Sequence, residues 1–127
     1  MLLAAYGTLR LKQPNFHFIG DEDKYLGTFE TEEKYEMFSL GFFPGIIEGG
    51  NTSITYDLFE IDNRDWNSIC RLEGYNGDNN TSFYYPVDIE TPKGIAKIFI
   101  INENPDKYRK IESGDWVKFI SEKIKCY

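Results

Sequence analysis

Apolar and polar residues alternate in two stretches of the chain, SITYDLFEI and KYEMFSL. Alternation with a period of two is typical of a β-strand that buries one face. We therefore predict a strand in each stretch. The side chains expected to share a face are Ile54, Tyr56 and Leu58 in the first stretch, and Tyr35, Met37 and Ser39 in the second.

The same pattern predicts a β-hairpin formed by FYYPVDIE, TPKG and IAKIFII. Thr91 to Gly94 are the expected turn, because Pro and Gly separate the two arms. Pro86 in the first arm has no N–H to donate, so this arm is expected at a sheet edge or at a bulge. The second arm is almost entirely apolar and is expected in the middle of the sheet.

Two segments have the spacing of apolar positions that predicts a helix. In the first, Asp62 is placed to cap the helix, Asp65 lies in its first turn and Gly74 provides the C-terminal stop. We interpret the apolar faces of both helices as core. The apolar positions are Trp66, Ile69 and Leu72 in the first helix, and Trp116, Phe119 and Ile120 in the second. The second helix is expected from about Asp115, with Lys123 at the same helical spacing.

The segment GFFPGIIEGGNTS, residues 41–53, is rich in glycine and contains a proline, so it is predicted to be a loop. Because this segment is also apolar, it is expected to pack against another part of the molecule.

Together, these elements predict one α+β domain over residues 1–127. We expect about five to seven mostly antiparallel strands and about two helices, with no repeats or linkers. A barrel-like sheet suits short strands and frequent glycines, because closure removes unpaired edges. The pattern leaves open whether the sheet closes.

Charge and hydropathy exclude two classes of partner. The net charge of −7 and the absence of a Lys/Arg cluster argue against nucleic-acid binding. The most basic stretch, Lys107 to Lys110, is interpreted as solvated surface. No run approaches the roughly 20 apolar residues of a membrane span, and Met1 to Ala5 is too short for the core of a signal peptide. We therefore expect a cytoplasmic protein with no membrane partner.

Familiar catalytic and metal-binding patterns are missing from the sequence. Cys70 and Cys126 form neither a disulfide framework nor a zinc-ligand spacing. His17 is the only histidine and has no nucleophile at a recognisable spacing, so we interpret it as structural or surface-exposed. The sequence contains no glycine-rich phosphate loop and no HExxH motif. No metal and no cofactor are therefore expected.

One carboxylate has an unusual position. Glu73, in RLEGY, falls in the last turn of the first predicted helix, where the partial negative charge of the carbonyl ends disfavours an anion. Burial among aromatic residues would act in the same direction and raise the pKa towards the range useful for proton transfer. A glutamate before a helix-ending glycine is usually a solvated residue, and this alternative stays open for Glu73.

Three short motifs occur in a familiar order: YGTLR after the first strand, FFPGI in the apolar segment and LEGY after the first helix. In this respect the chain resembles the γ-glutamylcyclotransferase-like, or AIG2-like, family. The resemblance covers nearly the whole chain and implies a small, mixed, barrel-like α+β fold. It also implies removal of a γ-glutamyl group as 5-oxoproline from a γ-glutamyl amine or a small γ-glutamyl compound, without a cofactor.

The resemblance also implies roles for particular residues. Glu73 would be the general acid/base, and the remaining site residues would bind the substrate. These are Tyr6, Gly7, Thr8 and Leu9 in the first loop, Phe43 and Pro44 as an apolar wall, and Tyr84 in the following strand. Core packing is an alternative role for Phe43 and Pro44.

Gly7 is expected to let the backbone turn sharply after the first strand. The N–H groups from Gly7 to Leu9 could then point at a substrate carboxylate or at the oxyanion formed on the γ-carbonyl. Such a loop binds an anion without a lysine, which is compatible with an acidic protein.

The sequence departs from the family at one position. Family members often have Tyr-Xaa-Arg in the strand after the glutamate, whereas this chain has Tyr84-Tyr85-Pro86. The polar stretch NGDNNTS before that strand could control access to the site or the choice of leaving group.

A non-catalytic module of the same fold, which binds a small metabolite or a partner protein, is the alternative function.

Overall fold

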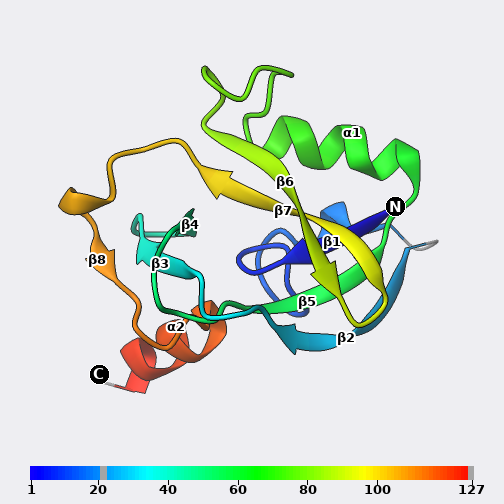
Figure 1. Ribbon diagram of the computed structural model, residues 1–127. Helices are drawn as coiled ribbons and strands as arrows, with labels where there is room; N and C mark the ends of the chain where they lie inside the picture. Colours follow the sequence, from blue (N-terminus) through cyan, green and yellow to red (C-terminus); the bar gives the residue numbers. More distant parts are fainter. Residues whose placement is uncertain (21–22, 126–127) are drawn as a thin grey trace.

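The computed structural model describes the chain over residues 1–20 and 23–125, with side chains described up to residue 122 (Figure 1). Cys126 and the side chain of Lys123, both considered above, lie outside these described parts. The elements are β1 Leu2–Ala5, the 3₁₀ helix Phe16–Phe18, β2 Lys24–Glu30, β3 Tyr35–Ser39, β4 Pro44–Glu48, β5 Thr55–Glu60, α1 Asn63–Leu72, β6 Tyr84–Thr91, β7 Gly94–Ile101, the 3₁₀ helix Pro105–Lys107, β8 Arg109–Lys110 and α2 Trp116–Lys125.

The described strands form two sheets, and no pairing between the edge strands β2 and β6 closes the larger sheet into a barrel. A five-stranded sheet has the order β2-β5-β1-β7-β6, and a three-stranded sheet has the order β4-β3-β8. The pairing is antiparallel throughout except between β1 and β7, which are parallel. The α+β, mostly antiparallel fold class is confirmed, although the described residues contain eight strands, more than we expected.

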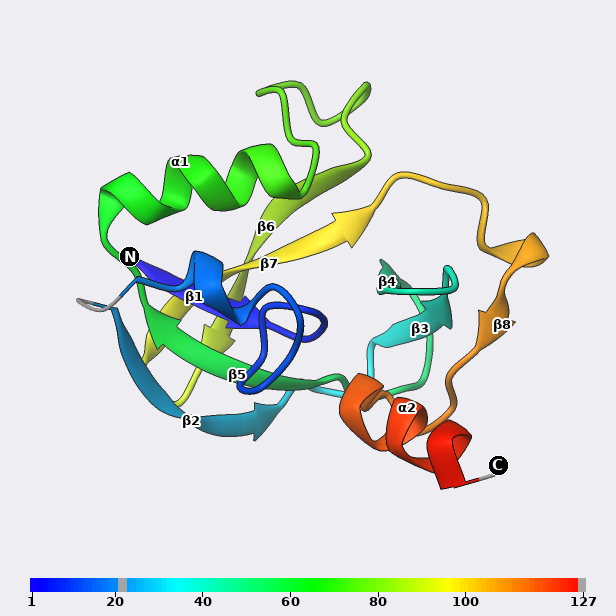
Figure 2. The ribbon, with the colours of Figure 1, turned by 180° about the vertical axis from the view of Figure 1, so that it is seen from behind.

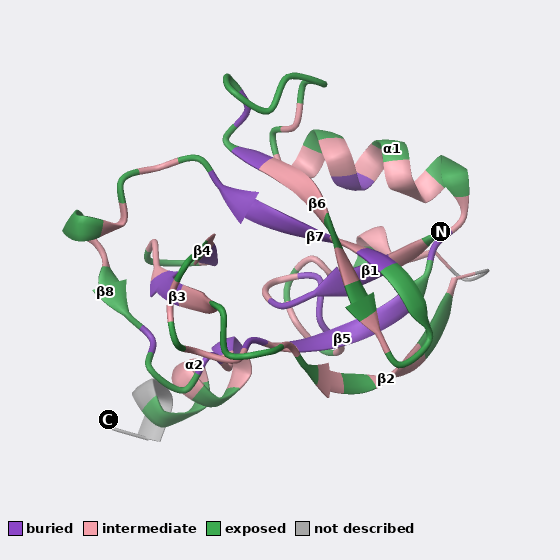
Figure 3. Cartoon of the chain, in the orientation of Figure 1, coloured by how far each residue is buried: buried purple, intermediate pink, exposed green. Residues whose placement is uncertain are grey.

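The large sheet is covered on both faces, and its central strands are the most buried part of the molecule (Figure 3). One face packs against the three-stranded sheet and α2, through side chains such as Leu58, Ile98 and Met37. The other face packs against α1 and the segment after β1, through Phe59, Phe99 and Ile69 among others. Burial on both faces explains why β7 is almost entirely apolar.

The predicted β6–β7 hairpin is confirmed. Thr91 pairs with Gly94 across a two-residue turn, and the Thr91 hydroxyl donates to the carbonyl of Gly94 over 2.7 Å. Strand β6 is an edge strand, as Pro86 required, and β7 lies between β6 and β1.

The prediction of a loop over residues 41–53 is wrong in its middle. Strand β4 begins at Pro44 and pairs with β3 in an antiparallel hairpin. Proline is tolerated at the first position of a strand, because that position need not donate to the ladder. Of the apolar residues that marked the segment, Ile46 and Ile47 lie in the strand, with Ile46 fully buried, whereas Phe42 and Phe43 lie in the turn before it.

Strand β2 had no predicted counterpart. Its register with β5 shifts between Tyr25 and Gly27, and Gly27 has a φ of 124° that favours glycine. This bulge breaks the alternation of period two by which strands are recognised.

Helix α1 begins and ends as predicted. The Asp62 side chain accepts a hydrogen bond from the N–H of Arg64, and Asp65 lies in the first turn. At the other end, the N–H of Gly74 donates to the carbonyl of Arg71, and the N–H of Tyr75 donates to the carbonyl of Cys70. Gly74 has a φ of 71°, in the left-handed region that favours glycine. This is the Schellman arrangement, which fixes the direction of the chain after the helix.

Helix α2 lies beside the three-stranded sheet, at the opposite end of the molecule from α1 (Figure 2). The predicted start is confirmed, because the Asp115 carboxylate accepts from the N–H of Lys118 over 3.1 Å. Trp116 is buried and stacks on Phe119, as expected of a core face. Among the described residues, no helix is long and apolar enough to cross a membrane.

Candidate active site

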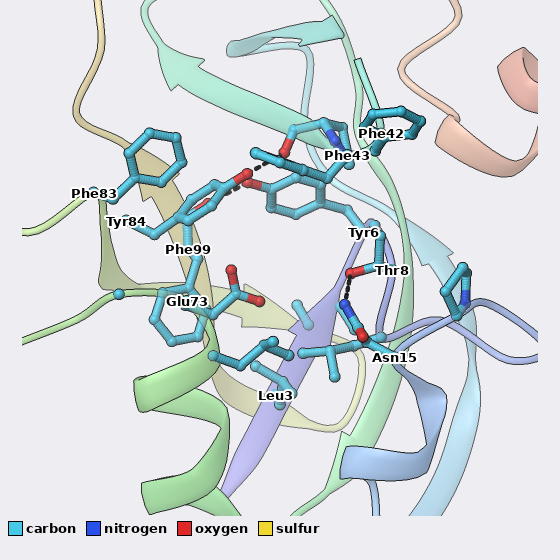
Figure 4. A pocket seen from close by; sticks show the side chains of 18 residues that line it. Leu3, Tyr6, Thr8, Asn15, Phe42, Phe43, Glu73, Phe83, Tyr84 and Phe99 are labelled. Carbon is cyan, nitrogen blue, oxygen red and sulfur yellow. Dashed lines mark hydrogen bonds between the residues drawn. The ribbon is translucent and has the colours of Figure 1, made fainter. Parts of the chain in front are cut away.

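A cavity of about 680 Å³ opens where β1 ends. Its walls come from the loop after β1, the β3–β4 turn, the C-terminal end of α1 and the start of β6 (Figure 4). The cavity brings together every residue for which the sequence suggested a role. These are Tyr6, Gly7, Thr8, Leu9, Phe43, Pro44, Glu73 and Tyr84.

The loop after β1 is a tight turn. The N–H of Arg10 donates to the carbonyl of Gly7 over 3.1 Å. The backbone N–H of Asn15 donates to the carbonyl of Thr8, and the side-chain amide of Asn15 donates to the Thr8 hydroxyl, each over 2.9 Å. By contrast, the N–H groups of Gly7, Thr8 and Leu9 donate to no acceptor within the described parts of the chain. Free backbone donors beside a cavity are suited to bind an anion.

The structure corrects the reason for Gly7. The chain does turn here, but Gly7 is not among the glycines with positive φ. A Cβ at this position would instead lie 2.9 Å from the ring carbons Cγ and Cδ of Pro44. Glycine is therefore needed because the loop passes so close to the first residue of β4.

A buried ion network holds the other side of this loop. The Arg10 guanidinium lies 3.3 Å from Asp57 of β5 and 2.9 Å from Asp115 at the start of α2. Asp57 also accepts from the N–H of Leu11 over 2.9 Å and from the hydroxyl of Thr28 over 2.7 Å. The turn is thus anchored to both the sheet and α2.

Glu73 is the C-terminal cap of α1, and its carboxylate points into the cavity (Figure 4). The residue is half-buried and lines the cavity. No hydrogen bond or ion pair joins this carboxylate to any residue that the structure describes. Burial without a compensating partner raises the pKa of Glu73 to about 7.

Two buried tyrosines lie above Glu73. The Tyr6 hydroxyl donates to the carbonyl of Phe99 over 2.7 Å, and the Tyr84 hydroxyl donates to the carbonyl of Pro44. Burial is the main cause that raises the pKa of each phenol well above the ordinary value. The nearby Glu73 charge acts in the same direction on both, after the effect of Tyr84 in the case of Tyr6. Both phenols therefore stay protonated, with the proton committed to a backbone carbonyl. Glu73 is left as the group that can gain and lose a proton near neutral pH.

The remaining predicted residues divide between wall and core. Leu9 lines the cavity, yet its side chain is buried in the core below α1, so its exposed contribution is the backbone. Phe43 is half-buried and contacts the Tyr84 ring at 6.4 Å between centroids. Pro44 is buried in β4. Phe43 and Pro44 therefore line the cavity and pack against the core at the same time.

Sequence reasoning missed several lining residues, which are Leu3, Ala4, Ala5, Pro14, Asn15, Phe42, Leu72, Gly74, Phe83 and Phe99. Leu72 and Gly74 flank Glu73 and could have been inferred from it. Asn15 carried no sequence signal, because its contact with Thr8 depends on how the intervening loop folds. His17 is exposed and Pro86 lies on the edge strand, and neither lines the cavity.

Residues 3–118 match the family model described as gamma-glutamyl cyclotransferase, AIG2-like. The chain belongs to this family. The match spans all of the elements that form the cavity, from β1 to β7.

Relatives agree over nearly the whole length of the chain. The gamma-glutamylcyclotransferase family protein YtfP from Escherichia coli is 32% identical over 117 residues, which cover 92% of this chain and 96% of YtfP. The solution structure of YtfP has a TM-score of 0.73 and covers 94% of this chain and 99% of its own. An uncharacterized protein from Pyrococcus horikoshii shares the fold at a TM-score of 0.81, with 24% identity and coverage of 98% and 97%.

Proposed function

We propose that this protein is a γ-glutamyl cyclotransferase that converts a γ-glutamyl amine, or a small γ-glutamyl compound, into 5-oxoproline and a free amine. Glu73 is the general acid/base. The observation that carries the proposal is the Glu73 carboxylate itself, which is unpartnered, faces the cavity and has a pKa of about 7. A group that titrates near the working pH is the most effective carrier of a proton.

The glutamyl group is held by the loop after β1. The free N–H groups of Gly7, Thr8 and Leu9 are the donors available to its anionic part, namely the α-carboxylate or the oxyanion that forms on the γ-carbonyl. The buried rings of Tyr6 and Tyr84 exclude water from the side of the cavity above Glu73.

The reaction is an intramolecular displacement. The α-nitrogen attacks the γ-carbonyl carbon, so that a new C–N bond closes the five-membered ring and the original amide C–N bond breaks. The α-ammonium loses two protons and the leaving nitrogen gains two. The Glu73 carboxylate carries these protons and ends the cycle ionised, as it began. Neither water nor a second substrate is consumed.

These demands on the protein are modest. Intramolecular reactions with good orientation reach effective molarities of about 10⁵–10⁸ M, so binding the substrate in a folded pose supplies much of the acceleration. One general acid/base adds about 10²–10⁴-fold. A cavity with free amide donors and a single carboxylate is therefore a sufficient set of groups.

The test is release of 5-oxoproline, measured by mass spectrometry, from a panel of γ-glutamyl amines, γ-glutamyl dipeptides and glutathione. We expect wild-type protein to release it, and we expect Glu73→Gln to reduce the rate by about 10²–10⁴-fold while preserving shape. Glu112→Gln, a change of the same kind at an exposed position, is the matched control and should behave as wild type.

Two outcomes would contradict the proposal. Release at the wild-type rate by Glu73→Gln would remove Glu73 from the mechanism. Specific binding of γ-glutamyl compounds without any turnover would favour the alternative, a non-catalytic module that binds a small metabolite.

A further inference from the structure

The mouth of the cavity is aromatic. Phe42 and Phe43 lie in the β3–β4 turn, and Phe83 immediately precedes β6 (Figure 4). The Phe83 ring meets the edge of Phe43 at 6.1 Å between centroids. Phe42 is 93% exposed, more than any other large apolar side chain that the structure describes. Phe83 is also exposed, at 37%, and exposed apolar side chains beside a cavity are typical of a surface that a ligand covers.

The lining of the cavity lacks positive charge. Among its described residues, Glu73 alone has a charged side chain, and no Lys, Arg or His contributes. The free amide donors lie in the loop after β1, on the wall opposite Phe83 (Figure 4). The mouth therefore offers no cation for a second carboxylate on the substrate.

The cavity is also larger than a glutamyl group requires. Its volume of about 680 Å³ lies well within the range of about 300–1,000 Å³ that holds a drug-sized ligand. Once the glutamyl group occupies the loop and Glu73, space remains towards the three phenylalanines. This space is where the group on the amide nitrogen would lie.

We propose that the preferred substrate is a γ-glutamyl amide of an apolar amine, with an aromatic or branched alkyl group and no carboxylate next to the amide nitrogen. This inference rests on the proposed function. The apolar group packs between Phe42, Phe43 and Phe83. A γ-glutamyl amino acid presents its carboxylate at this apolar mouth, where the carboxylate loses water without gaining a partner. The net charge of −7 adds to this unfavourable interaction.

Three substrates separate the contributions of the ring and the charge. γ-Glutamyl phenethylamide carries the ring alone, γ-glutamylphenylalanine adds a carboxylate, and γ-glutamyl methylamide removes the ring. We expect kcat/KM for the phenethylamide to exceed that of each of the other two by at least about tenfold, because discrimination by an apolar pocket is typically 10–200-fold. A fourth substrate, the 4-aminobutylamide, tests whether the aromatic mouth prefers a cation.

Phe42→Arg tests the position of the discriminating group. Its guanidinium supplies the missing cation, so the ratio of kcat/KM between the phenethylamide and γ-glutamylphenylalanine should fall by at least about tenfold. Because Phe42 is exposed, folding should tolerate the change. Ile95→Arg is the matched control: it makes the same change of charge at an exposed apolar residue of β7 that does not line the cavity, and the ratio should not change.

The outcomes distinguish the two proposals. Turnover of the whole panel with γ-glutamylphenylalanine or the 4-aminobutylamide preferred would overturn the inference and leave the cyclotransferase activity standing. If no substrate turns over, calorimetric binding to Glu73→Gln decides the specificity. Tighter binding of the phenethylamide than of γ-glutamylphenylalanine supports the apolar mouth, whereas equal or absent binding overturns it.

Discussion

Asp57 and Glu73 are both shielded carboxylates, yet their surroundings are opposite. Asp57 is 2% exposed and has a partner for each oxygen, from the backbone of Leu11, the hydroxyl of Thr28 and the guanidinium of Arg10. Glu73 faces a cavity and has no such partner among the described residues. A carboxylate whose oxygens are satisfied holds structure together, whereas one left unsatisfied is available for chemistry. The two residues should therefore respond to substitution in opposite ways.

Replacing Asp57 should have the largest effect on stability. We expect Asp57→Asn to lower the free energy of unfolding by about 3–5 kcal/mol, because it leaves the Arg10 charge buried without its partner on β5. Urea denaturation measures the loss.

A second variant checks the cause of that loss. Adding Arg10→Met to Asp57→Asn removes the stranded charge, so the double variant should lose less than the sum of the two single losses. A loss below about 1 kcal/mol for Asp57→Asn alone would mean that the network resembles a surface ion pair.

Replacing Glu73 should instead raise stability at high pH. An unfolded glutamate ionises near its ordinary pKa of 4.5, whereas Glu73 in the folded protein ionises at about 7. Between these values the unfolded chain binds fewer protons, so wild-type stability falls as pH rises. We expect Glu73→Gln to be more stable than wild type by about 1–3 kcal/mol at about pH 8, with the gain disappearing near about pH 4. A difference independent of pH would show that Glu73 is not buried as an unpaired anion.

The rate should follow the same ionisation. The base form of Glu73 predominates above about pH 7 and is lost as pH falls. Below that value, kcat/KM should decrease about tenfold per pH unit, which corresponds to about 1.4 kcal/mol. A pH series of 5-oxoproline release measures this limb. If the limb lies near the ordinary glutamate pKa, the carboxylate is solvated rather than desolvated.

The smallest effect is expected at the outer end of the ion network. The Asp115 side chain is 26% exposed, and asparagine preserves the hydrogen bond that caps α2. Asp115→Asn should therefore cost only about 0.5–1 kcal/mol in thermal or urea unfolding. A loss as large as that of Asp57→Asn would show that Arg10 depends equally on both carboxylates.

The sequence predicted the elements that depend on local signals. The cap at Asp62, the stop at Gly74 and the turn before Gly94 each follow from residues a few positions apart. The position of Glu73 at the end of α1 follows from the same local signals. Strand β2 was missed because its bulge disrupts the alternation, and β4 because Pro44 was taken as a loop signal.

Contacts between distant residues could not be predicted. Arg10 and Asp115 are far apart in the sequence, and no pattern at either position indicates the other. Nor could the sequence show that Gly7 is needed for its approach to Pro44, since a glycine in YGTLR indicates a turn equally well. The free amide donors of the loop and the open carboxylate of Glu73 are likewise properties of the folded chain.

The central position of β1 affects how the protein is made. Strand β1 pairs with β5 on one side and with β7, residues 94–101, on the other. Strand β1 therefore gains this second neighbour only after residues 94–101 have been synthesised, and pairing over such sequence distances is slow. Until β7 arrives, apolar strand surface is uncovered, so nascent chains should depend on chaperones in a way that finished molecules do not.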